Sequence, residues 1–243
     1  MINLKPEDTI HKSYLNRLLI EILDDPIISQ AIAFKGGTCA AMLGFLDRFS
    51  VDLDFDLIKT INQKILRQRL HTIFNHLGLT VSKEFDRVLL FQLKYPSSSG
   101  RRNSIKLSIN TLRVKANQYQ VQYLMEIDRL ANCQTIETMF ANKLVAIRER
   151  YKLHRTLAGR DIYDIHYFFS HGFTYNSAVI RERTGLNSAG YLKKLADFVS
   201  VHVSQTLINE DLNALLPTNE FQKIRKVLLP ETFSFLRSPP ASS

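Results

Sequence analysis

Three aspartates recur at every second position in the segment VDLDFDL, at Asp52, Asp54 and Asp56. If this segment is a β-strand, its side-chain period of two places all three carboxylates on one face and the apolar residues on the other. Neighbouring carboxylates on one face lie roughly 6 to 7 Å apart, so they repel each other unless a cation neutralises them. Such oxygens are typical ligands of Mg²⁺, which often shares them with substrate phosphates. The alternative is an edge strand whose polar face is simply solvated.

A Gly36-Gly37-Thr38 turn lies shortly before these aspartates. Glycines let the backbone approach a bound group closely. A helix that begins at Thr38 presents free N–H groups and a positive dipole end, both of which favour phosphate. Most such turns are simple helix caps, but here the turn, a helix and the acidic strand follow one another within a short segment. The sequence therefore predicts an anion site beside a cation site.

A second group of charged residues has helical spacing in the C-terminal half. Lys143 and Arg150 flank one apolar helix face, where lysine could act as a point charge and arginine as a planar fork for a triphosphate. Asp161 and Asp164 are three residues apart and share a face of the next helix. The alternatives are cations whose stems cover apolar surface and, for Asp161, an acid that the helix dipole favours.

The elements that position these residues follow from the apolar periodicity. Helices are predicted at 11–25, 39–46, 63–77, 136–153, 160–171, 188–204, 207–216 and 220–228, and strands at 32–35, 51–57, 79–84, 87–95 and 104–110. The strand signal fades after residue 130. We therefore predict an α+β part at 1–130, a helical part at 131–236 and a disordered tail at 237–243.

Composition limits the class of protein. The chain has 243 residues, a formal charge of +9 and a pI near 9.6, which favours polyanionic partners such as nucleic acid or nucleotides. Cys39 and Cys133 stand far apart without metal-ligand spacing, so we expect two reduced core thiols. No apolar run is long enough for a membrane span and the N-terminus lacks a signal-peptide core. We expect a cytoplasmic protein with no membrane partner.

The stretch from Phe34 to Leu57 resembles the first motif of nucleotidyltransferases with the DNA polymerase β type of catalytic domain. Within that superfamily it is most similar to the AbiEii/MenT toxins. Those proteins carry a GG(S/T) turn, an Arg-x-Ser before the acids, a D-x-D pair, and later a lysine-containing helix and an R-D-x-x-D helix. The matching residues are Gly36, Gly37, Thr38, Arg48, Ser50, Asp52, Asp54, Lys143, Arg160, Asp161 and Asp164. The similarity extends from about residue 34 to 170.

The resemblance implies a polymerase β-like domain with a mixed sheet, followed by a C-terminal helical bundle. It implies transfer of a nucleoside monophosphate from an NTP to an RNA acceptor, in relatives the 3′ end of tRNA, with Mg²⁺ held by Asp52 and Asp54. It also implies a cognate antitoxin as partner. The implied catalytic residues are Asp52, Asp54, Lys143 and Asp161. The implied nucleotide contacts are Gly36, Gly37, Thr38, Arg48, Ser50, Arg150 and Asp164.

One position departs from the family pattern. Where the family usually has a third acid, in the strand SIKLSIN, this chain has Ser108. Three arrangements are compatible with this change: Asp56, Asp161 or Asp164 takes over the role, two acids hold the metal, or activity is reduced. Two other functions also fit the composition, namely nucleotidyl transfer to a protein or small-molecule hydroxyl, and a non-catalytic basic protein that binds nucleic acid or a partner.

Overall fold

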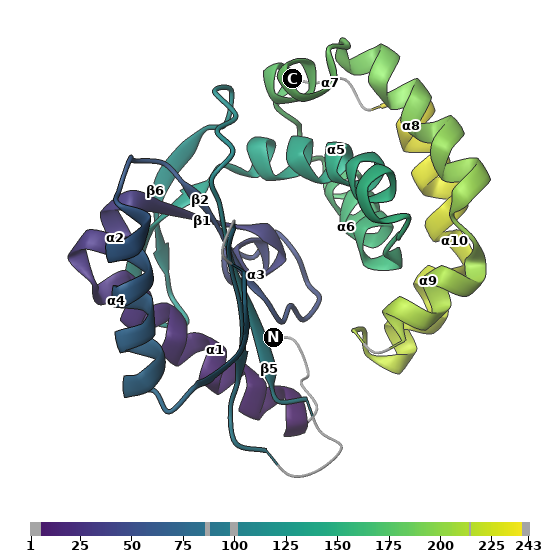
Figure 1. Ribbon diagram of the computed structural model, residues 1–243. Helices are drawn as coiled ribbons and strands as arrows, with labels where there is room; N and C mark the ends of the chain where they lie inside the picture. The colour runs from purple at the N-terminus through teal and green to yellow at the C-terminus, as the bar shows by residue number, and fades with distance from the viewer. Residues whose placement is uncertain (1–5, 86–87, 98–101, 214, 240–243) are drawn as a thin grey trace. The chain divides into compact units, whose positions relative to one another are not determined.

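Two units of different architecture make up the chain, and the computed structural model describes residues 6–85, 88–97, 102–213 and 215–239. The first unit consists of residues 1–113 and 119–134 and combines a sheet with helices. The second consists of residues 114–118 and 135–243, and its described elements are all helices (Figure 1). This mixed α+β fold is the class that the sequence predicts.

Among the described residues of the first unit, seven strands form one mixed sheet. Its helices are α1 (Pro6–Asp24), α2 (Pro26–Ala31), α3 (Gly36–Met42) and α4 (Gln63–His76). Its strands are β1 (Ile32–Lys35), β2 (Leu53–Leu57), β3 (Thr80–Glu84), β4 (Leu89–Lys94), β5 (Ser104–Asn110), β6 (Tyr119–Leu124) and β7 (Arg129–Gln134). The strand order is β3-β4-β5-β2-β1-β7-β6.

The acidic strand β2 lies in the middle of this sheet. It pairs in parallel with β5 and antiparallel with β1. The alternative interpretation of the aspartates, a solvated edge strand, is therefore wrong. Because β2 is flanked on both sides, its backbone is fixed by two neighbouring strands, and its side chains have defined positions relative to β1 and β5.

The two faces of β2 differ as the alternation predicts. Leu53 and Phe55 are buried, and Leu53 lies in register with Leu107 of β5, which in turn lies opposite Phe91 of β4. Phe74 of α4 packs edge-on against Phe91, so α4 covers this apolar face. Asp54 and Asp56 project from the opposite face. The hydrophobic core therefore holds one side of the strand and leaves the other side for polar contacts.

Three elements of the first unit were not predicted. Helix α1 ends at Asp24, and the segment between it and β1, which was predicted to have no helix, forms a further helix, α2, that begins at Pro26. Its start is stabilised because the Asp25 side chain accepts hydrogen bonds from the N–H groups of Ile27 and Ile28. Strands β6 and β7 were also missed, and the predicted boundary at residue 130 lies inside β7.

The helical unit contains six described helices. They are α5 (Ile136–His154), α6 (Gly159–Ser170), α7 (Ser177–Thr184), α8 (Ser188–His202), α9 (Gln205–Leu212) and α10 (Thr218–Arg237). Helix α7 was not predicted. The short segment 114–118 belongs to this unit because the Glu182 carboxylate accepts hydrogen bonds from the N–H groups of Lys115 (2.8 Å) and Ala116 (2.7 Å). These two bonds hold the pKa of Glu182 below its ordinary value.

Helix α10 is longer than predicted. The sequence pattern predicts an end at Leu228, before Pro230, yet the helix continues to Arg237 with Pro230 inside it. Leu228, Thr232 and Leu236 are all buried, so packing on both sides of the proline outweighs the lost backbone hydrogen bond. Arg237, predicted as the first residue of a tail, is thus helical, and residues 240–243 of that predicted tail lie outside the described part of the chain. Within the described part, no helix combines the length and apolarity needed to cross a membrane.

Candidate active site

The Asp54 carboxylate lies directly against the glycine turn, which is the Gly36-Gly37 segment that begins α3 immediately after β1. Gly36 has φ +79°, a conformation that favours glycine. A Cβ atom added to Gly36 would lie only 2.9 Å from Asp54 Oδ2. The glycine is therefore required twice, once for its backbone conformation and once for the close approach of the carboxylate.

Ser108 provides the hydrogen bond that orients Asp54. It lies beside Asp54 in the parallel register of β2 and β5, and its hydroxyl donates to Asp54 Oδ1 at 2.5 Å. Among the described residues, no cationic side chain forms an ion pair with Asp54, and Ser108 is its one hydrogen-bond donor. The position that carries an acid in the resembled family thus holds a neutral donor here.

Asp52 lies just before β2 and is held through its backbone. The Thr38 hydroxyl, in the first turn of α3, donates to the Asp52 carbonyl oxygen at 2.5 Å. The Asp52 carboxylate lies 3.5 Å from the Lys106 ammonium, and both side chains are partly exposed. This contact is a weak, solvent-accessible ion pair. Thr38 therefore connects the glycine turn to the first of the acids.

Asp56 differs from the other two aspartates because it is only 3% exposed and is surrounded by donors. Its Oδ1 atom accepts from Lys35 at 2.5 Å, and its Oδ2 atom accepts from Gln134 at 2.6 Å and Tyr119 at 3.0 Å. A longer contact of 3.4 Å comes from Asn110. With both oxygens engaged, Asp56 connects β1, β2, β6 and β7. This geometry makes it a structural anchor and gives no support to its use as a third metal ligand.

The contacts of Asp56 identify three residues that the sequence analysis missed. Tyr119 and Gln134 come from β6 and β7, the two strands that were not predicted. The alternation in YQVQY was a signal for β6, but RLANCQ has no clear period. Lys35 was also missed, although it directly precedes Gly36, and its ion pair with Asp56 fixes the start of the turn.

The second glycine of the turn accommodates Arg48 and Ser50. A Cβ on Gly37 would lie 2.9 Å from Ser50 Oγ and 3.1 Å from the Arg48 Nη2 atom. Arg48 is buried, and its Nη1 donates to the carbonyl oxygen of Phe49 at 3.0 Å. The structure thus brings together all seven predicted site residues of the first unit: Gly36, Gly37, Thr38, Arg48, Ser50, Asp52 and Asp54.

A buried histidine supports the segment that leads to the acids. His11 of α1 donates from Nε2 to the Val51 carbonyl oxygen at 2.9 Å, since a carbonyl can only accept. Its Nδ1 lies 2.9 Å from the Tyr95 hydroxyl. Burial lowers the pKa of His11 below its ordinary value of 6.5. A neutral ring therefore fixes the backbone next to Asp52.

The other four predicted residues form a separate cluster within the helical unit, which we call the helix ion-pair cluster: Lys143, Arg150, Asp161 and Asp164. The Lys143 ammonium lies 2.6 Å from Asp164 Oδ2 and 3.3 Å from Asp161 Oδ1. Arg150 forms an ion pair with Asp161. Both aspartates are buried, whereas the side chains of Lys143 and Arg150 are 19% and 34% exposed. Asp161 does lie in the first turn of α6.

Asp52 and Asp54 are suitable ligands for a divalent cation. Both carboxylates are hard oxygen donors, which is the chemistry that Mg²⁺ selects. Asp54 fits this role best, since its described side-chain partner is neutral and a glycine keeps the space beside its Oδ2 atom free of a side chain. Among the described residues, no group of three or more His, Cys, Asp or Glu side chains could hold a metal ion.

The family comparison decides the class of protein. A family model described as the nucleotidyl transferase AbiEii toxin of type IV toxin–antitoxin systems matches residues 17–234. The chain belongs to the AbiEii nucleotidyltransferase toxin family. Membership implies nucleotidyl transfer, an NTP substrate and an antitoxin partner, and enzymes of this class generally use a divalent metal ion. No curated protein is similar enough in sequence to be matched.

Solved structures share the fold of this AbiEii-family chain. JHP933 from Helicobacter pylori has 21% sequence identity and a TM-score of 0.57, and the match covers 97% of this chain and 94% of JHP933. MenT4, a nucleotidyltransferase toxin from Mycobacterium tuberculosis, has 16% identity and a TM-score of 0.52, with 97% of this chain and 85% of MenT4 covered. At these identities the similarity establishes the fold.

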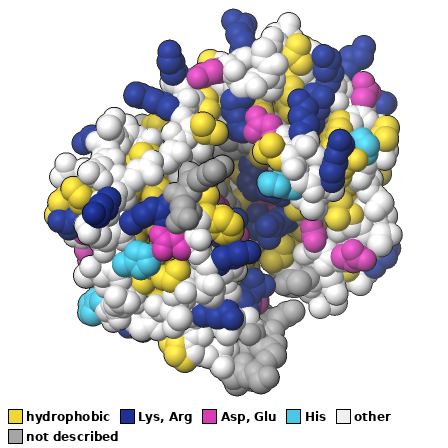
Figure 2. Space-filling model, in the orientation of Figure 1, with side chains coloured by type: hydrophobic (Ala, Val, Ile, Leu, Met, Phe, Trp, Pro, Cys, Tyr) yellow, Lys and Arg dark blue, Asp and Glu magenta, His cyan; other side chains and the backbone are white. Residues whose placement is uncertain are grey.

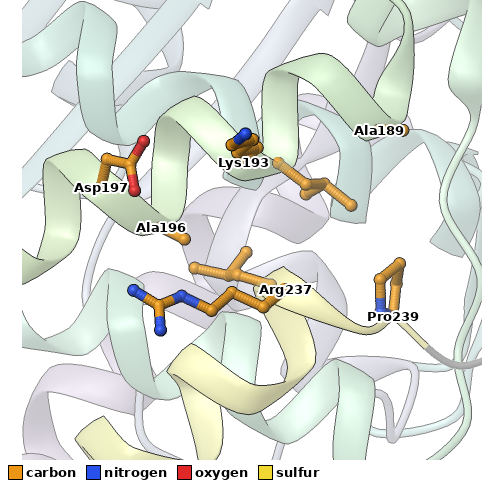
Figure 3. A pocket seen from close by; sticks show the side chains of 8 residues that line it. Ala189, Lys193, Ala196, Asp197, Arg237 and Pro239 are labelled. Atoms are coloured by element: carbon orange, nitrogen blue, oxygen red, sulfur yellow. The ribbon is translucent and has the colours of Figure 1, made fainter.

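A pocket of about 430 Å³ lies elsewhere in the AbiEii-family chain, within the helical unit. Figure 3 shows Ala189, Lys193, Ala196 and Asp197 along α8, with Arg237 and Pro239 facing them from the end of α10 and the residues after it. None of the predicted site residues lines this pocket. On the molecular surface, Lys and Arg side chains are spread over the face in view in Figure 2 and are more abundant there than Asp and Glu.

Proposed function

We propose that this protein transfers a nucleoside monophosphate from an NTP to an RNA acceptor, the 3′ end of a tRNA, with Mg²⁺ bound by Asp52 and Asp54. The single observation that carries the proposal is the state of Asp54. Its carboxylate is held against a glycine turn and hydrogen-bonded to a neutral hydroxyl, without an ion pair to any described cation. A negative group in this state is prepared to bind a cation.

The chain's own residues would fix the geometry of the reaction. Ser108 orients Asp54, and Thr38 holds the backbone of Asp52, so the two acids keep a defined relation to the Gly36-Gly37 turn. We assign the N–H groups of this turn, together with Arg48 and Ser50, to contacts with the triphosphate. When bound, Mg²⁺ would neutralise phosphate charge and stabilise the attacking and leaving oxygens. Fixed donors and acids of this kind act without reorganisation during the reaction.

The helix ion-pair cluster enters the proposal with a second role. We assign Lys143 and Arg150 to nucleotide contacts and Asp161 and Asp164 to holding these two cations in fixed orientation. Charge-assisted hydrogen bonds to buried carboxylates restrict the rotamers of long cationic side chains. An oriented cation contributes more to phosphate recognition than a mobile one, because less side-chain entropy is lost on binding.

The formal charge of +9 supports RNA as the acceptor. Contacts between several Lys or Arg side chains and phosphates make binding fall steeply as the salt concentration rises. A protein or small-molecule hydroxyl is the second candidate acceptor, and its binding would show little salt dependence. Measurement of the binding of total tRNA at 50 and 200 mM salt separates the two: we expect a loss of affinity of at least about tenfold.

The decisive experiment follows a labelled nucleotide. The protein is incubated with Mg²⁺, total RNA and each of the four NTPs labelled at the α-phosphate, and the label is then located in RNA, protein or neither. We expect label in RNA at the size of tRNA, sensitive to removal of the 3′ end. Label in protein would show that the acceptor is a protein hydroxyl and not RNA. If no NTP, acceptor or divalent metal gives any label, the result would favour a non-catalytic binding protein.

Two variants make this assay specific for the site. Asp54→Asn removes the charge and keeps the shape of the side chain, whereas Asp197→Asn makes the same change at an exposed position in the helical unit. We expect the first variant to lose incorporation and the second to keep it. Equal incorporation by wild-type protein and Asp54→Asn would reject the proposed site.

A further inference from the structure

Strand β6 forms one end of the sheet, and its sequence lacks the usual protection of an edge. It follows β7 as the last strand in the order, so one side of its backbone faces away from the sheet. Edge strands normally carry lysine, proline or a bulge that prevents pairing with another chain. The strand Tyr119–Leu124 contains no charged residue and no proline, and its pairing with β7 is regular along its length. Nothing in the strand itself opposes the addition of a further strand.

The side chains near this edge are apolar and exposed. Val121 is 67% exposed and Tyr123 52% exposed, and Leu130 of the adjacent strand β7, opposite Tyr123, is 66% exposed. Val121, Tyr123 and Leu130 share one face, because residues opposite each other in an antiparallel pair project to the same side. Tyr119 is on this face too, where its hydroxyl bonds Asp56. An apolar stripe therefore extends to the edge of the sheet on the face that carries the acids.

The sequence of β6 is self-complementary. Residues 119–123 read YQVQY in either direction. If two copies pair antiparallel about Val121, each Val121 faces its counterpart, Tyr119 faces Tyr123 and Gln120 faces Gln122. Opposite residues of like kind, aromatic with aromatic and amide with amide, are favourable cross-strand pairs. A two-fold arrangement needs such a self-complementary patch.

The charged residues that flank β6 have opposite signs at its two ends, as an antiparallel pair of two copies requires. Ten uncharged residues, 116–125, separate Lys115 from Glu126. In an antiparallel pair the basic end of one copy meets the acidic end of the other at both ends of the strand. A parallel pair would bring like charges together. Glu126 already forms an ion pair with Lys12 (2.9 Å) in its own chain, so the charge order disfavours a parallel pair more than it strengthens the antiparallel one.

We propose that two copies of this chain associate through antiparallel pairing of their β6 strands, with the two-fold axis at Val121. The sheet then continues from one copy into the other through main-chain hydrogen bonds, and the exposed side chains of Val121 and Tyr123 in the two β6 strands lie side by side across the axis. This interface is independent of the proposed transfer reaction, since none of its contacts involves Asp52 or Asp54.

The first test measures the mass of the full-length protein in solution by sedimentation over a range of concentrations. The wild-type chain should form a dimer. Val121→Lys places two like charges directly opposite each other at the axis and should raise the dissociation constant roughly tenfold or more. Leu130→Lys is the matched control, because Leu130 is equally exposed and on the same face but lies one strand away from the edge. It should change the dissociation constant less than about threefold.

The second test uses a cysteine placed at the axis. Cys39 and Cys133, the natural cysteines, are both buried, so Val121→Cys adds an exposed thiol. In the proposed pair the two Cβ atoms at position 121 face each other at about 4.5 Å, within reach of a disulfide after a small local adjustment, and oxidised glutathione accepts the two electrons when it forms. Leu130→Cys should remain uncrosslinked under the same conditions.

Three results would overturn the proposal. A wild-type chain that stays monomeric up to about 100 μM excludes the interface. Equal weakening by Val121→Lys and Leu130→Lys places the contact on the face of the sheet and not at its edge. Absence of a crosslink in Val121→Cys at concentrations where the dimer forms shows that another surface is used. Circular dichroism melts of each variant ensure that the comparison is made between folded proteins.

Discussion

Carboxylates and cations occur together in two regions of the molecule, and the two regions are balanced differently. In the helix ion-pair cluster, two buried aspartates are matched by Lys143 and Arg150. On β2, Asp56 is matched by Lys35 and Asp54 is paired with the neutral Ser108. Asp52, just before the strand, has a distant and solvent-exposed partner in Lys106. The first region is close to neutral, whereas the second keeps negative charge on one face of a central strand.

Aspartates in the two regions have different roles because their partners differ in charge. A buried carboxylate that is fully matched by cations connects elements, because removal of either partner leaves an uncompensated charge. A carboxylate that is oriented by a neutral donor retains its charge for a ligand that is not part of the chain. Asp54 and Asp56 are two residues apart on one strand face, yet they fall into these two classes.

Loss of the charge at Asp54 should have the largest effect, and this effect should be on activity and not on stability. Asp54→Asn should lower the rate of nucleotide incorporation about 10³-fold, equivalent to about 4 kcal/mol of transition-state stabilisation, because a metal ligand is lost. Its melting temperature should stay within about 2 °C of wild type. Initial rates and thermal melts on one preparation provide both values. A variant that melts much earlier without loss of rate would place Asp54 with the structural acids.

The buried acids should respond in the opposite way. Asp56→Ala removes the partner of Lys35 and the acceptor for Tyr119 and Gln134, and we expect a loss of about 3 kcal/mol in the free energy of unfolding. Asp164→Ala, which removes the closest partner of Lys143 in the helical unit, should cost a similar amount. Urea unfolding gives these values. A loss below about 1 kcal/mol for either variant would show that it is not an anchor.

Two glycines with the same backbone conformation test the approach of Asp54 to the turn. Gly36 has φ +79° and Gly44 has φ +76°, so alanine is strained at both and should cost about 1 kcal/mol at each. A Cβ at Gly36 would meet Asp54 Oδ2 at 2.9 Å, whereas a Cβ at Gly44 has nothing within 4 Å. Gly36→Ala should therefore also reduce incorporation at least about tenfold, and Gly44→Ala should not. Equal rates for the two variants would contradict the proposed contact.

The smallest expected effect is a pH dependence that arises from His11. Its folded-state pKa is lowered by burial, so the folded protein binds fewer protons than the unfolded chain near and below pH 6.5. The stability contribution is therefore complete above pH 6.5 and is lost as the pH falls below it toward the folded-state pKa. Between pH 7.5 and 5.5, the free energy of unfolding of the wild-type protein should fall by up to about 1 kcal/mol more than that of His11→Asn. Identical pH profiles in urea unfolding would contradict this.

The sequence predicted the parts of the fold whose local patterns are strong. The alternation in VDLDFDL predicted β2 and its two faces, because that signal comes from neighbouring residues. The helix after the glycines was predicted at 39–46 but spans Gly36–Met42, so its existence was predicted and its bounds were not. The central position of β2 was not predictable in this way. It depends on pairing with β5 and β1, and pairing partners are set by tertiary packing and not by local period.

The candidate site was predicted in part for the same reason. The residues of its motifs are close in sequence, but Tyr119 and Gln134 reach Asp56 from strands that have weak local signals. The role of Ser108 was visible only as a departure from a family pattern. Its hydrogen bond to Asp54 requires the parallel register of β2 and β5, which the sequence does not specify.

The attachment of residues 114–118 to the helical unit has a consequence for the modularity of the protein. The chain enters the helical unit at Val114, returns to the first unit for β6 and β7, and enters the helical unit a second time at Thr135. A recombination event with one junction at either point would separate Glu182 from the amides of Lys115 and Ala116, or the hairpin from its sheet. We therefore expect recombination to exchange the two units together and not one at a time.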